Sequence, residues 1–197
     1  MKLDSTIVFE DLRDALKDLD AARGSPKRVR QAFTRFVDLT QKLTSTMRKD
    51  FSRIKGEKWN PVAFGGWNKV SDFFKWMRNH DQHELPIRIS VHERDFYEHP
   101  RIPGRVFHFE GTWGLEDQVS DEMPSGMTFH PTDPATGEQL DPVPPIRVEY
   151  QYLVQLSSES IRKRLREIGT TDMHQLAAAC FEVMKAYYEY FLVRVGA

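Results

Sequence analysis

The chain has 197 residues, is 40% hydrophobic and 29% charged, and carries a formal net charge of −1. This length allows a single domain with a substantial core, and the single cysteine excludes a disulfide framework and a thiolate zinc site. No apolar stretch approaches the roughly 20 residues of a membrane span, and acidic residues occupy the segment where a secretory signal would be apolar. We therefore expect a cytoplasmic protein that needs no membrane.

The N-terminal part shows helical periodicity. A first helix is expected from about 4 to 22, and its apolar residues include Ile7, Leu12, Leu16 and Leu19. Ser25 followed by Pro26 is typical of a helix start. Apolar residues at three- and four-residue steps then predict one long amphipathic helix that ends near Gly56.

The segment 58–68 is punctuated by proline and glycine and carries Trp59, Phe64 and Trp67. Two interpretations stay open. These aromatic side chains either cover an edge of the core or stack on nucleic-acid bases. A third helix is expected from about 69 to 83, because Pro86 disfavours helical geometry in the residue before it.

The middle of the chain, 85–156, changes to a strand-like pattern. Alternation over 87–92, a run of β-formers over 105–113 and clean alternation over 146–154 predict a small antiparallel sheet of about three strands. The proline-rich, acidic segment 114–145 is expected to be a long loop with little regular structure.

The C-terminal part returns to helical patterns. Ser157 or Ser158 is expected to cap one helix, and Thr171 or Asp172 to cap a last helix that runs to about Arg194. The sequence therefore predicts a mainly helical α+β fold in a single domain, 1–197. In it, 1–84 and 157–197 form a bundle of about four to five helices, and 85–156 is an insertion of sheet and loop.

Two blocks of charge underlie the near-neutral total. Between positions 23 and 58 there are eleven Lys or Arg against three acids, whereas 110–141 holds eight acids and no Lys or Arg. Such blocks mark either solvated faces or interaction surfaces. If the basic helix contacts phosphates, the nucleic-acid-binding candidates are Arg28, Arg35, Lys42, Arg48, Lys49, Arg53 and Lys55.

The third expected helix ends in a polar run that contains Arg78, Asn79 and His83. The Arg-x4-His spacing, with a polar residue directly after the arginine, resembles the signature of the HEPN superfamily of small helical bundles. Arg94 and Arg101 also precede a histidine at a similar spacing. The match at Arg94 follows a predicted strand, and the match at Arg101 falls across a predicted turn.

The resemblance implies a metal-independent endoribonuclease of the toxin or phage-defence type, acting on RNA without a cofactor. His83 would be the general base, Arg78 would stabilise charge on the phosphate, and Asn79 would orient one of them. It also implies a composite site at a homodimer interface, with an antitoxin as a further candidate partner. Within one helix, Arg78 is offset by roughly 100° from Asn79, so we expect convergence only at a frayed helix end or across a dimer.

Two alternatives stay open. His80 and His83 share the spacing of a helical metal pair, which His92 or His108 would complete. The other alternative is a non-catalytic regulatory or protein-binding module, whose acidic insert docks on a partner or mimics nucleic acid.

Overall fold

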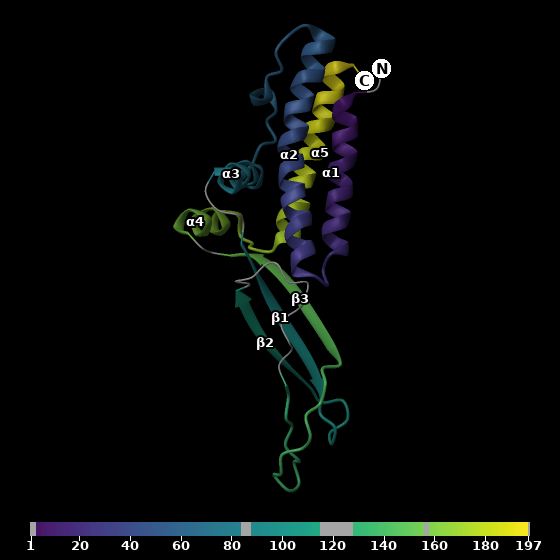
Figure 1. Ribbon diagram of the computed structural model, residues 1–197, viewed down its shortest axis with the longest axis vertical. Helices are drawn as coiled ribbons and strands as arrows, with labels where there is room; N and C mark the ends of the chain where they lie inside the picture. The colour runs from purple at the N-terminus through teal and green to yellow at the C-terminus, as the bar shows by residue number, and fades with distance from the viewer. Residues whose placement is uncertain (1–2, 84–87, 115–127, 156–157, 197) are drawn as a thin grey trace.

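The computed structural model describes residues 3–83, 88–114, 128–155 and 158–196, apart from the side chains of 80–83. Within these residues, five α-helices and a three-stranded antiparallel sheet confirm the prediction of a mainly helical α+β fold. The long helices α1 (Asp4–Ala21), α2 (Pro26–Lys55) and α5 (Met173–Val195) run side by side, as Figure 1 shows. Helices α3 (Lys69–His83) and α4 (Glu159–Ile168) lie beside this bundle. The sheet extends from one end of the bundle, and both termini lie at the other end.

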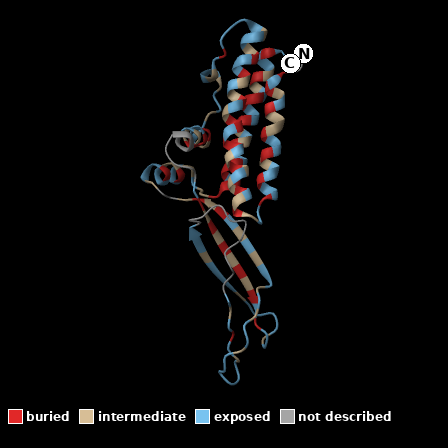
Figure 2. Cartoon of the chain, in the orientation of Figure 1, coloured by how far each residue is buried: buried red, intermediate tan, exposed pale blue. Residues whose placement is uncertain are grey.

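The core fills the space between the three long helices, where the buried residues of Figure 2 gather. Its largest fully buried side chains include Leu12, Leu19, Phe33, Phe36, Leu43, Met47, Tyr187 and Phe191. Of the apolar residues noted in the first helix, Ile7 is 47% exposed, and its neighbour Val8 is buried. Val8 lies four residues before Leu12 and therefore shares its face of the helix, whereas Ile7 does not.

The helix ends follow the predicted capping residues. The hydroxyl oxygen of Ser25 accepts a hydrogen bond from the backbone N–H of Arg28, and Gly56 ends α2 with a φ of 71°. Ser158 caps α4, and Asp172, rather than Thr171, caps α5 by accepting from the N–H of Gln175 at 2.8 Å. Ser157, the alternative cap of α4, lies outside the described residues.

The aromatic residues between α2 and α3 pack on the bundle, which supports the first of their two interpretations. Trp59 is 9% exposed and donates from Nε1 to the hydroxyl of Tyr187 at 2.5 Å. Trp67 donates from Nε1 to the carbonyl oxygen of Pro61 at 2.8 Å, beside the short 3-10 helix Pro61–Ala63. The ring centroid of Trp67 lies 4.4 Å from that of Tyr187.

The sheet has the order β2–β1–β3, with β1 (Ile89–Glu98) antiparallel to both β2 (Val106–Gly114) and β3 (Arg147–Val154). The first strand is longer than predicted, since the pattern suggested a strand over 87–92. Between β2 and β3, the described part of the loop folds back on itself through isolated bridges such as Phe129 to Val143. No helix in the described ranges is both long and apolar enough to cross a membrane.

Candidate functional site

A wide surface hollow of about 1300 Å³ lies along α2 and is closed on one side by α3. We call it the basic groove, because the residues that line it include seven Lys or Arg and one acid, Asp38. The seven cations are Arg30, Arg35, Lys42, Arg48, Lys49, Lys75 and Arg78.

The helical repeat explains why α2 presents these charges together. Arg35, Lys42 and Lys49 are seven residues apart, and two helical turns bring each of them back to nearly the same side of the helix. Phe36, Leu43 and Met47 occupy the side that packs into the core. Lys75 and Arg78, three residues apart on α3, add a second row.

The groove cations differ from those of α1 in how they are paired. On α1, Arg13, Lys17 and Arg23 (just after its end) each contact an acid three residues earlier. In the groove, Arg35 pairs with Asp18 at 2.7 Å. Within the described residues, no Asp or Glu forms an ion pair with the following cations: Arg30, Lys42, Arg48, Lys49 and Lys75.

A row of cations in which positive charges outnumber acids produces a positive potential that attracts anions. A face that serves only solubility would be expected to mix the two signs, as α1 does. The arrangement of the groove therefore favours an interaction surface over a merely solvated helix face.

Four of the seven predicted nucleic-acid-binding residues lie in the groove: Arg35, Lys42, Arg48 and Lys49. Arg28 lines a separate hollow between α1 and α2, and Lys55 is exposed at the end of α2. Arg53 contacts Asp50 of its own helix at 2.5 Å and Asp4 of α1 at 3.6 Å.

The predicted catalytic residues are not brought together within one chain. Arg78 is half-buried and lines the basic groove, and Asn79 is exposed outside it. The side chain of His83 lies outside the described residues, but α3 remains helical through position 83. Positions 78 and 83 therefore lie roughly 140° apart around the helix axis, and no frayed end brings them together.

Two buried carboxylates on the sheet had not been singled out from the sequence. Glu93 and Asp95 both have 0% exposure and lie on the same side of β1. Trp113 donates from Nε1 to Glu93 Oε2 at 3.2 Å, and the Tyr97 hydroxyl donates to Asp95 Oδ2 at 3.0 Å. Burial, together with the nearby charge of Asp95, raises the pKa of Glu93.

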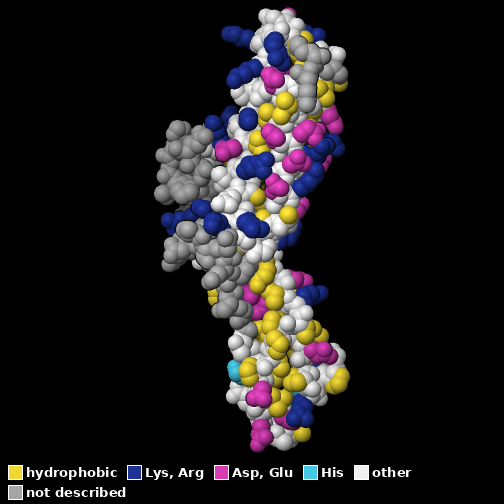
Figure 3. Space-filling view, turned by 45° about the vertical axis from the view of Figure 1, so that its right-hand side comes forward, with side chains coloured by type: hydrophobic (Ala, Val, Ile, Leu, Met, Phe, Trp, Pro, Cys, Tyr) yellow, Lys and Arg dark blue, Asp and Glu magenta, His cyan; other side chains and the backbone are white. Residues whose placement is uncertain are grey.

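Because successive side chains of a strand alternate between its two sides, both acids fall on the inner side of β1. This alternation was the only signal for them in the sequence. Apolar and aromatic neighbours surround them, and Figure 3 shows hydrophobic side chains gathered along the sheet-bearing end of the molecule. Among these neighbours, Phe109 and Trp113 are 39% and 37% exposed.

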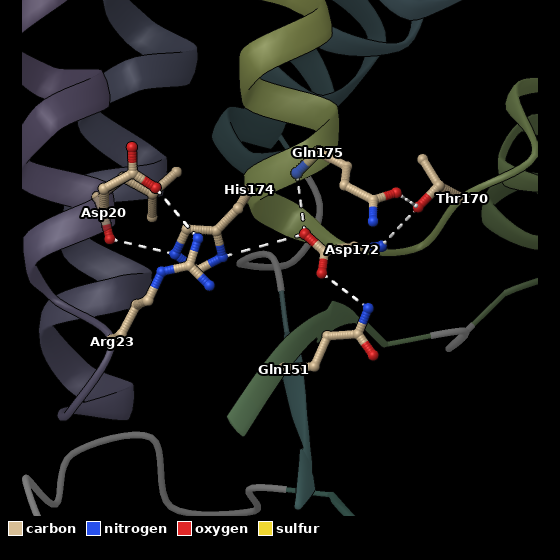
Figure 4. A network of polar contacts seen from close by, with 8 residues as sticks. Asp20, Arg23, Gln151, Thr170, Asp172, His174 and Gln175 are labelled. Carbon is tan, nitrogen blue, oxygen red and sulfur yellow. Dashed lines mark hydrogen bonds and ion pairs between the residues drawn. The ribbon is translucent and has the colours of Figure 1, made fainter. Parts of the chain in front are cut away.

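A polar network joins the sheet to the bundle (Figure 4). Asp172 accepts from the side-chain amide of Gln151 on β3 at 2.8 Å and lies 4.0 Å from His174 on α5. His174 Nε2 donates to the carbonyl oxygen of Leu19 at 3.2 Å. Burial and the charge of Arg23 lower the pKa of His174, which favours the neutral form of this histidine.

The described side chains contain no group of three His, Cys, Asp or Glu placed to hold a metal ion. His80 and His83 of the metal alternative have side chains outside that description, whereas His92 Nδ1 lies 2.9 Å from the hydroxyl of Thr112. Comparison with known proteins finds no matching family model, no similar curated protein and no similar solved structure.

Proposed function

We propose that this protein binds RNA along the basic groove. The observation that carries the proposal is the row of five groove cations that form no ion pair with a described acid: Arg30, Lys42, Arg48, Lys49 and Lys75. Phosphate neutralisation by such residues, with release of counterions, supplies most of the affinity of sequence-independent nucleic-acid binding. Binding would therefore depend strongly on salt concentration.

The dimensions of the groove fit a polymer better than a small anion. Arg30 and Lys49 are separated by about 28 Å along the axis of α2. A nucleic-acid strand places several phosphates over this length, since they follow each other about every 3.4 Å along a duplex axis. Separate cations along the helix can thus each contact a different phosphate.

The finer part of the proposal is cleavage by a HEPN-like, metal-independent mechanism of the toxin or phage-defence type. Its support is the position of Arg78 in the wall of the same groove, where its guanidinium would face a bound phosphate. Because positions 78 and 83 do not share a helix face, the proposal requires a homodimer in which one copy supplies Arg78 and the other supplies His83. An antitoxin would be a protein that occludes the groove.

A charge-matched pair of variants tests the binding. The groove variant is Lys42→Gln, Lys49→Gln and Lys75→Gln, and the control variant is Lys58→Gln, Lys163→Gln and Lys185→Gln, which replaces three exposed lysines outside the groove. Affinity for single-stranded RNA is measured by fluorescence anisotropy at several salt concentrations.

The groove variant should bind weakly, and its plot of log affinity against log salt should be shallower by about two units, given roughly 0.7 per lost phosphate contact. The control variant should retain the parent slope. Equal slopes for both variants would show that RNA does not occupy the groove.

Cleavage is tested separately with labelled RNA in the presence of EDTA. The parent should cut the RNA, and His83→Ala and Arg78→Ala should each abolish cutting, while His83→Ala retains the affinity for RNA. Intact RNA with the parent protein would refute the ribonuclease proposal and leave the binding proposal standing.

A second candidate function, a protein-binding or regulatory module, is favoured by a different observation. The sheet exposes Phe109, Trp113 and Ile146, with 39%, 37% and 60% of their surfaces in contact with solvent. Apolar groups gathered on one surface commonly mark a contact with another protein. Residues 115–127 of the acidic insert predicted to dock lie outside the described residues. Failure of RNA to bind the parent at low salt would favour this second function.

A further inference from the structure

A partly open cavity of about 270 Å³ lies between α2, α3, α5 and the segment around Pro61. We call it the side cavity. It shares four wall residues with the basic groove: Gln41, Thr44, Arg48 and Lys75. A ligand in the groove can therefore extend one of its groups into the cavity without leaving the cations.

The inner wall of the side cavity suits a flat apolar ring. Phe74, Cys180, Met184 and Tyr187 line it, and each has at most 3% of its surface exposed. Burial raises the pKa of the Cys180 thiol, so this residue contributes a neutral surface. Trp67 completes the wall.

The two largest rings of this wall are held in place by their own hydrogen bonds. Trp67 bonds to the carbonyl oxygen of Pro61, and the Tyr187 hydroxyl accepts from Trp59. Their ring centroids are 4.4 Å apart and their planes are tilted by 53°. A wall that is ordered before binding reduces the entropic cost of taking up a ligand.

The mouth of the side cavity is polar and carries both donors and acceptors. Arg48 and Lys75 supply positive charge, Asp72 supplies a carboxylate, and Gln41 offers an amide. The volume equals that of about nine water molecules, which is comparable with the roughly eight to eleven non-hydrogen atoms of a nucleobase. Ring wall, polar mouth and adjacent cations together match the parts of one nucleotide.

We infer that the side cavity receives one unstacked nucleobase of a single RNA strand whose phosphates lie on Arg48 and Lys75. The inference rests on the proposed RNA binding and adds the substrate class: a single-stranded segment with one base turned out of its stack. Base pairing in a duplex would oppose this insertion, whereas proteins that bind single strands commonly stack bases on aromatic side chains.

Two threonines of α2 provide a matched pair of variants. Thr44 and Thr46 are both half-buried, and each donates its hydroxyl to a carbonyl oxygen of its own helix. Thr44 lines the side cavity and the groove, whereas Thr46 lines only the groove. Thr44→Leu therefore fills the cavity, and Thr46→Leu adds the same bulk outside it. Val62→Phe fills the cavity from the opposite wall at a residue that is 82% exposed, which guards against a folding defect.

The experiment compares binding of a short oligouridylate with binding of a base-free ribose-phosphate chain of equal length, by fluorescence anisotropy. The parent and Thr46→Leu should prefer the oligouridylate by about tenfold, which corresponds to one stacked base. Thr44→Leu and Val62→Phe should bind both chains alike, at the parent's affinity for the base-free chain. Circular dichroism confirms that each variant is folded.

The outcomes separate this inference from the proposed function. Equal binding of both chains by the parent overturns the side-cavity inference and leaves RNA binding in the groove intact. An unchanged preference in folded Thr44→Leu and Val62→Phe also overturns it. Absence of binding to either chain at low salt refutes RNA binding, and the inference fails with it.

Discussion

Glu93 and Asp95 lie two residues apart on the same buried side of β1, each with 0% of its surface exposed. Trp113 donates to the first carboxylate and Tyr97 to the second. Burial and the hydrogen bond to Asp95 also raise the pKa of Tyr97 to about 12. Two neighbouring acids in an apolar setting cannot both be charged without cost, so Glu93 holds its proton more tightly in the folded protein than in the unfolded chain.

This pair predicts that stability falls as the pH rises. The pKa of Glu93 in the folded state lies above its ordinary value of 4.5. The contribution of Glu93 to stability is therefore complete below pH 4.5 and is lost as the pH rises through the folded-state pKa. Glu93→Gln removes the charge and should raise the free energy of unfolding at pH 8 by about 1 kcal/mol. Urea unfolding at pH 4 and pH 8 measures the difference.

Glu110, on the other side of the sheet, is the control for this prediction. Its hydrogen bonds to Arg94, at 2.9 and 3.1 Å, and the charge of that arginine lower the pKa of Glu110. The contribution of Glu110 to stability therefore has the opposite pH dependence: it is present above the ordinary pKa and is lost as the pH falls. Glu110→Gln should not stabilise the protein at pH 8. If both variants shift stability in the same direction at that pH, the assignment of the buried pair is wrong.

His174 predicts a second pH dependence, on the acid side. Burial holds the folded-state pKa of this histidine below its ordinary value of 6.5, so the unfolded chain gains a proton first as pH falls. Stability should decline from about pH 6.5 downward. His174→Gln retains an N–H donor for the Leu19 carbonyl and should show a smaller decline between pH 7 and pH 5. Parallel curves for parent and variant would contradict the prediction.

Asp172 should be among the costliest polar residues to truncate. One of its oxygens caps α5 through the N–H of Gln175, and the other accepts from Gln151 on β3, so Asp172→Ala removes two bonds at the joint between sheet and bundle. We expect a loss of about 2 kcal/mol. Ser158→Ala removes the single cap bond of α4 at 3.3 Å and should cost about 1 kcal/mol or less. Chemical denaturation compares the two, and equal losses would mean that the bond to Gln151 contributes little.

The helices were predictable because their ends are encoded locally. Ser25, Gly56 and Ser158 act within a few residues of their own positions, and the structure uses each of them as the sequence suggested. The face of a helix was less certain where apolar residues adjoin. Ile7 and Val8 are adjacent apolar residues on different faces of the helix, and the packing of α1 on its neighbours buries Val8.

The candidate site was only half predictable, because its second wall is a tertiary feature. A heptad of basic residues on α2 is visible in the sequence, whereas Lys75 and Arg78 join it only because α3 packs against α2. The buried acids of β1 were missed for a similar reason. Two charged residues in a strand pattern suggest that the strand has ended. Burial of these acids is tolerable only because Trp113 and Tyr97 donate hydrogen bonds to them and neighbouring strands cover them.

Mixing two inactive variants tests whether the proposed ribonuclease site is shared between two copies. In a homodimer where each site takes Arg78 from one copy and His83 from the other, a mixed dimer of Arg78→Ala and His83→Ala retains one intact site. Each variant alone retains none. RNA cleavage in EDTA should therefore reappear when the two variants are unfolded together and refolded, at about a quarter of the parent rate, because half of the dimers are mixed and each has one site. A site contained within one copy would give no recovery, because every copy in the mixture lacks either Arg78 or His83. Such a site would also have to bridge the roughly 140° between positions 78 and 83 on a continuous α3.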